Sequence, residues 1–378
     1  MPHVHVLLDT SIYRRDPARR SAAFRTLSRL AAAELIHLHL PWVAKREFET
    51  YLEDKCADQV QQITTAVKGL KRSLPESLHG RFDATLEASN ALAEGLAGGV
   101  LTGFEEWLTS ANATIHEVEA ATTPDILDAY FAGTAPFRAR KSREDFPDAF
   151  IWQTARSIAT EHGHLSLVTA DGGLAEAATG DDTVTTYASL DEFIESDECQ
   201  VLLRRHFASV NINRLRAVLP AAAAGLTPAA SAAIEGELEN AMVNSHQIPE
   251  DNREARIAGV GEATDLSLDA TRAQDYGDGV IVVPFAARSE CLLNYCIFIA
   301  DYYGLDEERS KHISVSSWND HYYDAEEYYE LEVEGRLTIV LDVDQLHERE
   351  LDDAELTDLA ETADVEVDSI ESISVSGD

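Results

Sequence analysis

Cysteine is scarce in this chain of 378 residues, and its four cysteines are far apart. No Cys-x-x-Cys pair occurs, and so few scattered thiols cannot form a disulfide framework. We interpret them as reduced, mostly buried thiols. No run approaches the roughly 18 uninterrupted apolar residues of a membrane helix, and the first apolar strand is too short for a signal peptide. We therefore expect a cytoplasmic protein without a membrane partner.

Several sequence motifs of common enzyme classes are also absent. The sequence holds no glycine-rich phosphate loop of the Walker or dinucleotide type, and no Ser or Cys stands in a nucleophile-elbow sequence. A strand that ends in Asp9 is shared with haloacid-dehalogenase phosphatases, but these need a second Asp two residues later, where this chain has Ser11. These absences exclude four large enzyme classes.

Basic residues are few. The chain has 30 Lys and Arg residues against 68 Asp and Glu residues, which gives a net charge of −38. This balance argues at first against a nucleic-acid partner. The acid is unevenly distributed, however, with a formal charge of −9 over residues 1–220 and −29 over residues 221–378. The first part of the chain is therefore the better candidate for binding a polyanion.

Two basic clusters in that first part flank acidic positions. One follows Asp9 directly and the other precedes Asp148. Cations beside carboxylates suit a polyanionic substrate, although the alternative is that they are solvated helix ends and loops. The substrate-binding residues that we predict are Arg14, Arg15, Arg138, Arg140, Lys141 and Arg143, and the first cluster also includes Arg19 and Arg20.

Four acids follow or begin secondary-structure elements. Residues 3–8 (HVHVLL) predict a buried strand that Asp9 closes, and Glu47 lies on a helix that opens after Pro41. The residues of this helix that we expect to face inward are Val43, Phe48, Tyr51 and Leu52. Asp148 stands at the start of an amphipathic helix from Pro147, and Asp171 follows the strand 165–169. Because open parallel sheets collect chemistry at the carboxyl ends of their strands, these acids can share one site.

Clustered carboxylates repel one another at neutral pH and are relieved by divalent cations, and Mg²⁺ and Mn²⁺ prefer such hard oxygen ligands. We predict Asp9, Asp148 and Asp171 as direct or water-mediated ligands and Glu47 as a ligand or a positioner of water. The auxiliary residues that we predict are Thr10, Thr169 and Asp145, with a helix cap as the favoured role of Asp145. The simpler alternative for all these acids is ordinary caps and surface charge.

Alternating strands and helices predict an α/β fold, a parallel sheet flanked by helices, followed by a second, smaller α+β domain. The helix from Asp16-Pro17 is expected to end near Ala33, and residues 76–120 to be helical with a break at Gly98-Gly99. Residues 190–207 are expected to form the last helix of the first domain. A turn is expected at Glu334-Gly335 in the second domain. The domains that we predict are residues 1–207 with a helical insertion at about 60–135, an Ala-rich connector over 208–278, and an acidic α+β domain over 279–378.

The four acidic segments, in this order and on these elements, resemble the active-site pattern of PIN-domain nucleases. The segments are VLLDTS, PWVAKREFE, FPDAFIW and LVTADGGLA, and the resemblance covers roughly residues 1–195. The match is closest to larger bacterial PIN-like proteins with a helical insertion and a further C-terminal domain. One departure is Gly173, where the family often shows a second Asp, and it leaves the choice between one and two metal ions open.

The resemblance implies a metal-dependent endonuclease, a ribonuclease that acts on single-stranded RNA. It also implies Mg²⁺ or Mn²⁺ as cofactor and products with 5′-phosphate and 3′-hydroxyl ends. The alternatives are a non-catalytic RNA- or protein-binding scaffold with a degenerate site, and a DNA or flap nuclease. A toxin-like role restrained by a protein inhibitor is a further implication. The acidic C-terminal part is expected to bind a partner or to compete with RNA for the basic residues. The oligomeric state stays open.

A group of histidines and a Tyr-rich segment are expected to have structural roles. His3, His5, His37 and His39 occupy alternate strand positions, which favours hydrogen-bonded core residues over zinc ligands. The segment 318–324 (WNDHYYD) is polar and aromatic, and a Tyr-rich loop of this kind in a small β domain is usually structural.

Overall fold

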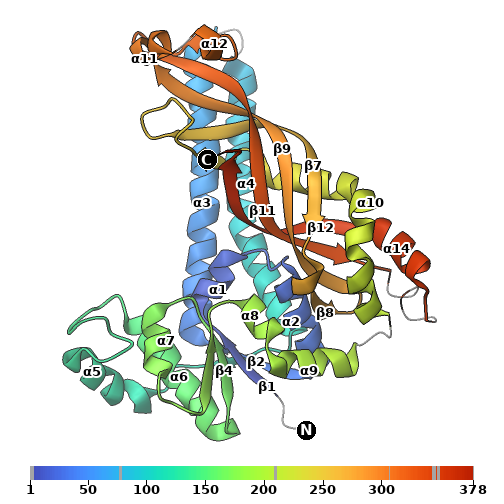
Figure 1. Cartoon of the computed structure of the whole chain (residues 1–378). Coiled ribbons are helices and arrows are strands. Elements are labelled where there is room, and N and C mark those ends of the chain that lie inside the picture. Colours follow the sequence, from blue (N-terminus) through green and yellow to red (C-terminus); the bar gives the residue numbers. More distant parts are fainter. Residues whose placement is uncertain are drawn as a thin grey trace. The chain divides into compact units, whose positions relative to one another are not determined.

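The computed structural model describes residues 4–75, 79–207, 211–305, 307–342, 346 and 350–377. The chain divides into two compact units, residues 1–199 and residues 200–378. Figure 1 shows the helices and strands of both units.

Within the described residues, the first unit is built on a five-stranded parallel sheet in the order β3-β2-β1-β4-β5. The chain moves from β1 outward through β2 to β3, and then returns to the other side of β1 for β4 and β5. The point where this order reverses lies between β1 and β4, which pair from Val6 with Ser166 to Leu8 with Val168. The parallel sheet predicted from the sequence is confirmed, with strands β1 Val4–Leu8, β2 Ile36–Pro41, β3 Thr114–His116, β4 Leu165–Val168 and β5 Val184–Tyr187.

Helices connect these strands, and several begin or end away from the predicted positions. The helix predicted from Pro17 begins later, because the Ser21 hydroxyl caps it by accepting from the Phe24 N–H. The last predicted helix, residues 190–207, is split at Ser196. The shorter helices are α1 Thr10–Arg15, α2 Ala22–Ala32, the 3₁₀ turn η2 Ala120–Thr122, α5 Thr123–Ala132, α6 Phe146–His162, α7 Gly172–Ala178, α8 Leu190–Glu195 and α9 Asp197–His206.

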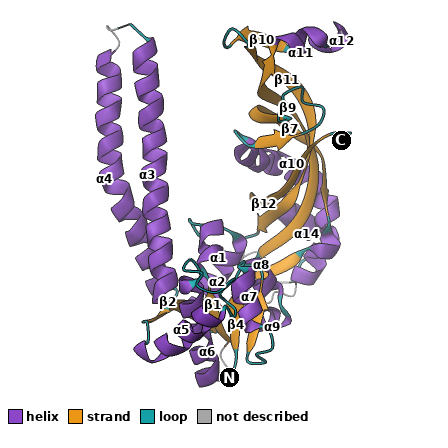
Figure 2. Ribbon diagram, turned by 90° about the vertical axis from the view of Figure 1, so that its left-hand side faces the viewer, coloured by secondary structure: helices purple, strands orange, loops and turns teal. Residues whose placement is uncertain are grey.

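The predicted helical insertion is a long hairpin of two helices, α3 Trp42–Ser73 and α4 His79–Ser110 (Figure 2). The break expected at Gly98-Gly99 is wrong, since α4 continues through both glycines. Packing against α3 outweighs the roughly 1 kcal/mol that each helical glycine costs relative to alanine. The short strand β3, which follows the hairpin, was expected to be helical.

The base of the hairpin is joined to the sheet domain by an aromatic core. Tyr13 of α1 contacts Phe48 of α3 and Phe104 of α4, with ring centroids 5.2 and 5.7 Å away. All three side chains are fully buried. Trp107 of α4 donates its indole N–H to the Ser28 hydroxyl of α2 over 2.9 Å. Position and orientation of α3 are therefore fixed at the end that carries Glu47.

The second unit is a twisted antiparallel sheet in the order β10-β11-β9-β7-β6, with β12 added to β11 and β8 to β9 (Figure 1). Its strands are β6 Met242–Asn244, β7 Glu254–Leu268, β8 Gln274–Gly277, β9 Val280–Phe298, β10 Ser314–Ser317, β11 Tyr322–Val340 and β12 Asp364–Val375. Its described helices are α10 Ile212–Leu238, the 3₁₀ turn η3 Ala270–Arg272, α11 Ile299–Gly304, α12 Glu307–Ser310 and α14 Asp353–Glu361.

The segment expected to be an Ala-rich connector differs most from its prediction. In the described part of residues 208–278, α10 and β7 belong to the core of the second unit, where Leu219, Leu226 and Ile257 are fully or almost fully buried. Arg214–Leu238 of α10 is also apolar and long enough to cross a membrane by length and composition alone. Its apolar side chains instead pack on the sheet and on α14. The sequence did not predict this core helix, because alanine shows little contrast in hydrophobicity between the buried and the exposed face of a helix.

The turn predicted at Glu334-Gly335 is also wrong, because β11 runs straight through it. Gly335 is needed for close approach: a Cβ there would stand 2.2 Å from the Ser369 carbonyl oxygen of β12. Glu330 and Glu334 alternate with buried Leu331 and Val333, which gives the acidic outer face expected from the sequence. In residues 318–324, Asn319 accepts the N–H groups of His321 and Tyr322, as in a structural turn. Val343, Glu348 and Asp378, parts of the predicted C-terminal elements, lie outside the described residues, as does His3.

Candidate metal centre

Asp9 lies at the carboxyl end of β1 and caps α1. Its carboxylate accepts from the Thr10 N–H at 2.6 Å, from the Ser11 hydroxyl at 2.6 Å and from the Thr169 hydroxyl at 3.0 Å. The residue is only 4% exposed. Each donor comes from the chain directly after β1 or from the end of β4, so the point where the strand order reverses holds this carboxylate in one orientation.

Thr169 and Ser11 join the two strand ends. The Thr169 hydroxyl donates to Asp9 and accepts from the Asp171 N–H at 3.0 Å, while the Ser11 hydroxyl accepts from the Ala170 N–H at 3.0 Å. The auxiliary position predicted for Thr169 is therefore beside two of the predicted acids. Ser11 was not assigned a role from the sequence, although its place two residues after a strand-ending Asp was a usable signal.

Glu47 reaches the same place from α3. Its carboxylate accepts from the Thr10 hydroxyl at 2.9 Å, which makes Thr10 the contact between the ends of β1 and α3. Burial raises the pKa of Glu47, and the Thr10 hydroxyl and the Arg14 guanidinium oppose that rise. Half-buried acids of this kind are costly to ionise, and a nearby cation stabilises their charge.

Asp148 stands in the first turn of α6 and faces the other acids. Partial burial and the negative charges of Asp171, Asp9, Glu47 and Asp145 raise its pKa to about 7. Among the four neighbouring acids, Asp171 has the strongest effect on the pKa of Asp148. Because burial and the charges of four other acids act together on this carboxyl, Asp148 belongs to an acidic cluster.

Asp171 follows β4 and caps α7 by accepting from the N–H groups of Gly173 and Leu174 at 2.8 and 3.0 Å. A Cβ at position 173 would stand 3.0 Å from the Pro136 carbonyl oxygen and 3.1 Å from the Asp171 Oδ1. The crowding explains why glycine suits the position where a second Asp was expected by resemblance. An Asp side chain at position 173 would crowd the Asp171 carboxylate.

Arg138 was predicted to bind substrate, but in the structure it pairs with site acids. Its guanidinium donates to Asp171 at 3.0 Å and lies 3.7 Å from Asp145. Asp145 is almost fully buried and occupies the cap position of α6 without making a capping bond. It accepts instead from the Arg138 N–H at 2.8 Å. The favoured capping role of Asp145 is thus wrong, and its carboxylate orders the loop that carries Arg138.

The donor set suits Mg²⁺ or Mn²⁺, because carboxylate and hydroxyl oxygens are the hard ligands that both ions prefer. Asp9, Glu47, Asp148 and Asp171 are the residues that would hold the ion. Their carboxylates are spaced more widely than a closed cage: among the described residues, the group of three potential ligands with all ligand atoms within 4.8 Å is formed by histidines. Burial and the charges of the other acids raise the pKa of Asp148, and a bound cation would relieve this repulsion.

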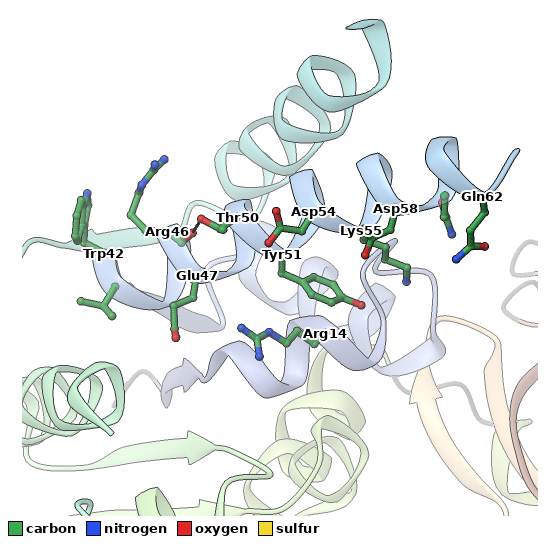
Figure 3. A pocket seen from close by; sticks show the side chains of 12 residues that line it. Arg14, Trp42, Arg46, Glu47, Thr50, Tyr51, Asp54, Lys55, Asp58 and Gln62 are labelled. Atoms are coloured by element: carbon green, nitrogen blue, oxygen red, sulfur yellow. Dashed lines mark hydrogen bonds between the residues drawn. The ribbon is translucent and has the colours of Figure 1, made fainter. Parts of the chain in front are cut away.

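A groove of about 810 Å³ runs along α3 and includes Glu47 in its lining (Figure 3). Glu47 lines it together with Arg14, whose guanidinium lies over the Tyr51 ring at 5.4 Å. The Lys55 Nζ lies 5.6 Å from the centroid of the same ring. Trp42, toward the other end of the groove, is 40% exposed. Other residues along the groove are Val43, Arg46, Thr50, Asp54, Asp58, Gln59 and Gln62.

This groove contains residues that the sequence interpretation missed or placed wrongly. Val43 and Tyr51 were expected to point into the core, but they line the groove, whereas Phe48 and Leu52 are buried. Arg46 and Lys55 were not predicted to contact substrate. The helical period counted from Glu47 was a usable signal, because positions three, four, seven and eight residues later lie on the same face.

Of the basic residues predicted to bind substrate, Arg14 lines the groove. Arg15 donates to the Ala188 carbonyl at 3.3 Å, and Arg140 to the Ala132 carbonyl at 3.3 Å. Lys141 and Arg143 are exposed on the segment between α5 and α6. Arg19 turns away from solvent and packs over Phe104 and Trp107. Of the first basic cluster, Arg14 therefore lines the groove, Arg15 is exposed at the surface and Arg19 packs against the aromatic core.

The comparison with protein families agrees with this arrangement. Residues 6–173 match the family model described as PIN domain, a range that includes all four acids and the helical hairpin. No curated protein and no solved structure shows significant similarity to the chain. PIN domains are a family of metal-dependent nucleases, which implies a nucleic-acid substrate in general. Residues 6–173 therefore form a PIN domain, and an additional C-terminal region follows.

Proposed function

We propose that the protein is a metal-dependent endoribonuclease that hydrolyses phosphodiester bonds of single-stranded RNA at the acidic cluster. The observation that carries the proposal is Asp148, a half-buried carboxyl whose pKa rises to about 7 through burial and through the negative charges of four nearby acids. Such a cluster lowers the stability of the fold, since like charges repel. A site that binds a divalent cation and a phosphodiester gives these charges a use.

Each acid has a distinct part in this proposal. Asp9 and Asp171, fixed by hydroxyl and backbone donors at two adjacent strand ends, hold the ion in position. Asp148 and Glu47 complete the ligand set from α6 and α3. A bound Mg²⁺ or Mn²⁺ supplies an activated water and stabilises charge on the phosphate oxygens. We infer that hydrolysis leaves 5′-phosphate and 3′-hydroxyl ends, as the family resemblance implies.

Single-stranded RNA is the proposed substrate because the groove beside Glu47 combines cations with aromatic rings. Arg14, Arg46 and Lys55 supply positive charge for the backbone, and Trp42 and Tyr51 offer ring faces for bases. Stacking of a base on an aromatic side chain contributes about 1–3 kcal/mol in single-strand binding proteins. Acidic residues, among them Glu47 and Asp54, line the same groove. We therefore expect RNA to bind there when a metal ion at the acidic cluster offsets their negative charge.

Cleavage of labelled single-stranded RNA by the full chain tests the proposal. Mn²⁺ or Mg²⁺ should support cutting, EDTA should stop it, and Asp171→Asn should abolish it. Asn retains the side-chain oxygen that caps α7, so this variant loses the charge with little effect on the fold. Asp128→Asn, an exposed position on α5, is the matched control and should cut like the wild type.

If Asp171→Asn cuts as fast as the wild type, the activity comes from a contaminant and the proposal fails. Binding of RNA without metal-dependent cutting would support the scaffold alternative. Faster cutting of double-stranded or flapped DNA than of RNA would move the function to a DNA nuclease with the same metal chemistry. The cytoplasm remains our proposed location.

Metal binding should depend on pH through Asp148. Because its pKa is about 7, the proton must leave before the carboxylate can ligate, so Mn²⁺ affinity should rise with pH and level off above 7. Below that value we expect a loss of up to about tenfold per pH unit, the limit for one displaced proton. Calorimetric titration with Mn²⁺ at pH 6 and pH 8 measures this. An identical pH dependence in Asp148→Asn would show that another group is responsible.

A further inference from the structure

Five histidines from four elements meet on one face of the sheet in the first unit. His5 of β1, His37 and His39 of β2 and His116 at the end of β3 come from adjacent strands, and His162 is the last residue of α6. The parallel register pairs His5 with His37, and alternate positions of a strand share a face. The sequence showed the strand histidines but gave no sign that α6 and β3 would add two more.

Three of these imidazoles are arranged as metal ligands would be. One ring nitrogen from each of His5, His39 and His162 lies within 4.8 Å of the others. The closest pair is the His5 Nδ1 and the His39 Nε2, 2.9 Å apart. Around a tetrahedral zinc ion with nitrogen ligands at about 2.0–2.1 Å, two such nitrogens stand roughly 3.3 Å apart. The pair therefore needs to open by only a few tenths of an ångström.

His162 can make the larger adjustment. Its ring stacks on that of His5 with centroids 3.9 Å apart and planes at 10°, so it must tilt to aim a nitrogen at the same point. The residue is exposed and stands at the end of α6, directly before Gly163. An exposed side chain at a helix end turns at little cost, and its exposure also gives an ion a path into the cluster. The negative end of the α6 dipole favours a cation at this place.

A second layer of contacts is already present. The Nδ1 of His39 lies 2.8 Å from the Nε2 of His116, so His39 can ligate through Nε2 while its other nitrogen donates to His116. Metal-bound histidines almost always make such a bond, which fixes the tautomer. Glu161 and Glu119 add negative charge near His116.

We propose that His5, His39 and His162 bind one transition-metal ion of the zinc class, with a fourth position open to water. Imidazole nitrogens suit Zn²⁺, Cu²⁺ or Ni²⁺, whereas carboxylate oxygens suit Mg²⁺ and Mn²⁺, so this site and the acidic cluster select different ions. Asp148 and His162 are 14 residues apart on α6, or about 21 Å along the helix axis at 1.5 Å per residue. The ion fastens the far end of α6 to β1 and β2 and thereby supports the helix that presents Asp148.

The test uses the full-length chain stripped of metal and titrated with Zn²⁺ in competition with a chromophoric chelator. We expect one ion per chain, and we expect Co²⁺ to give the visible absorption of a tetrahedral site. His162→Gln should weaken Zn²⁺ binding by about a hundredfold or more, at least the upper end of the loss seen when an outer-shell partner is removed. His164→Gln, two residues away and outside the cluster, is the matched control and should bind as the wild type does.

A second variant separates this site from the acidic cluster. Asp148→Asn should leave the Zn²⁺ affinity unchanged, and circular dichroism should show that every variant is folded. Failure of the folded wild type to bind Zn²⁺ at micromolar concentration would overturn the proposal, as would equal binding by His162→Gln. Loss of Zn²⁺ binding in Asp148→Asn with retention in His162→Gln would assign the ion to the acidic cluster and overturn it as well.

Discussion

Asp148→Asn should slow metal-dependent RNA cleavage by at least about a hundredfold to a thousandfold, the range found when one preorganised electrostatic group is removed from an active site. The reason is that Asp148 faces all the other acids of the candidate metal centre, so no neighbour can replace its charge. Single-turnover cleavage with Mn²⁺ in excess measures the chemical step. Asp128→Asn should match the wild type, and a loss below tenfold would place Asp148 outside the metal site.

The same substitution should stabilise the metal-free protein. The pKa of Asp148 is about 7 in the folded state against an ordinary value of 3.8, so between these values the folded chain holds more protons than the unfolded chain. Stability therefore falls as pH rises from 4 to 7, and the full penalty is present above 7. Because the group is partly exposed, we expect a gain of only about 1–2 kcal/mol from Asn at pH 8.

Urea unfolding in EDTA at pH 8 and near pH 4 measures this effect. At the lower pH the aspartic acid is neutral in the folded protein, so the variant and the wild type should nearly coincide. A variant that is less stable than the wild type at pH 8 would contradict the charge argument. Lower activity together with higher stability is a signature that a purely structural residue does not give.

Phe104→Ala should lower the free energy of unfolding of the first unit by about 3–5 kcal/mol, as for other fully buried phenylalanines. Phe104 is fully buried at the base of α4, and its ring contacts Phe48 at 4.9 Å and Tyr13 at 5.7 Å. The substitution also removes the ring that Arg19 covers. Urea unfolding followed by tryptophan fluorescence is suitable, because Trp107 lies in this cluster.

Phe131→Ala is the matched control, because Phe131 is 58% exposed on α5 and should cost less than about 1 kcal/mol. Phe104→Ala should also weaken Mn²⁺ binding, since Phe48 and Glu47 are neighbours on α3 and the Glu47–Thr10 hydrogen bond depends on the position of that helix. A folded Phe104→Ala variant as stable as the wild type would show that the hairpin packs independently of the site.

Local sequence was sufficient to place an element where its hydrophobic residues follow a clear period and a proline or glycine marks its ends. Pro41 before α3, Pro147 in the first turn of α6 and Gly163 after it placed these helices to within one or two residues. The order of strands and helices indicated a parallel sheet, whose carboxyl edge gathers the acids that end its strands. The four predicted acids lie around one place for this reason.

Local sequence failed where packing between distant segments decides. Gly98-Gly99 reads as a helix break, yet α3 supports α4 through it. Glu334-Gly335 reads as a turn, yet the close approach of β12 requires the glycine within a continuous strand. The alanines of α10 read as a connector, yet they let the helix pack closely on a sheet. Each residue has a local preference that a few kcal/mol of tertiary contact outweigh.

The sequence by itself determined the sheet type, the order of the acids and the oxygen chemistry of their site, because strand ends and helix starts are local properties. Only the tertiary structure decided that Arg138 pairs with Asp171, that α3 forms a groove beside Glu47, and that His116 and His162 join His5 and His39. These pairings join residues 33 to 157 positions apart. Their partners are set by how the helices and strands pack, and no local pattern records that choice.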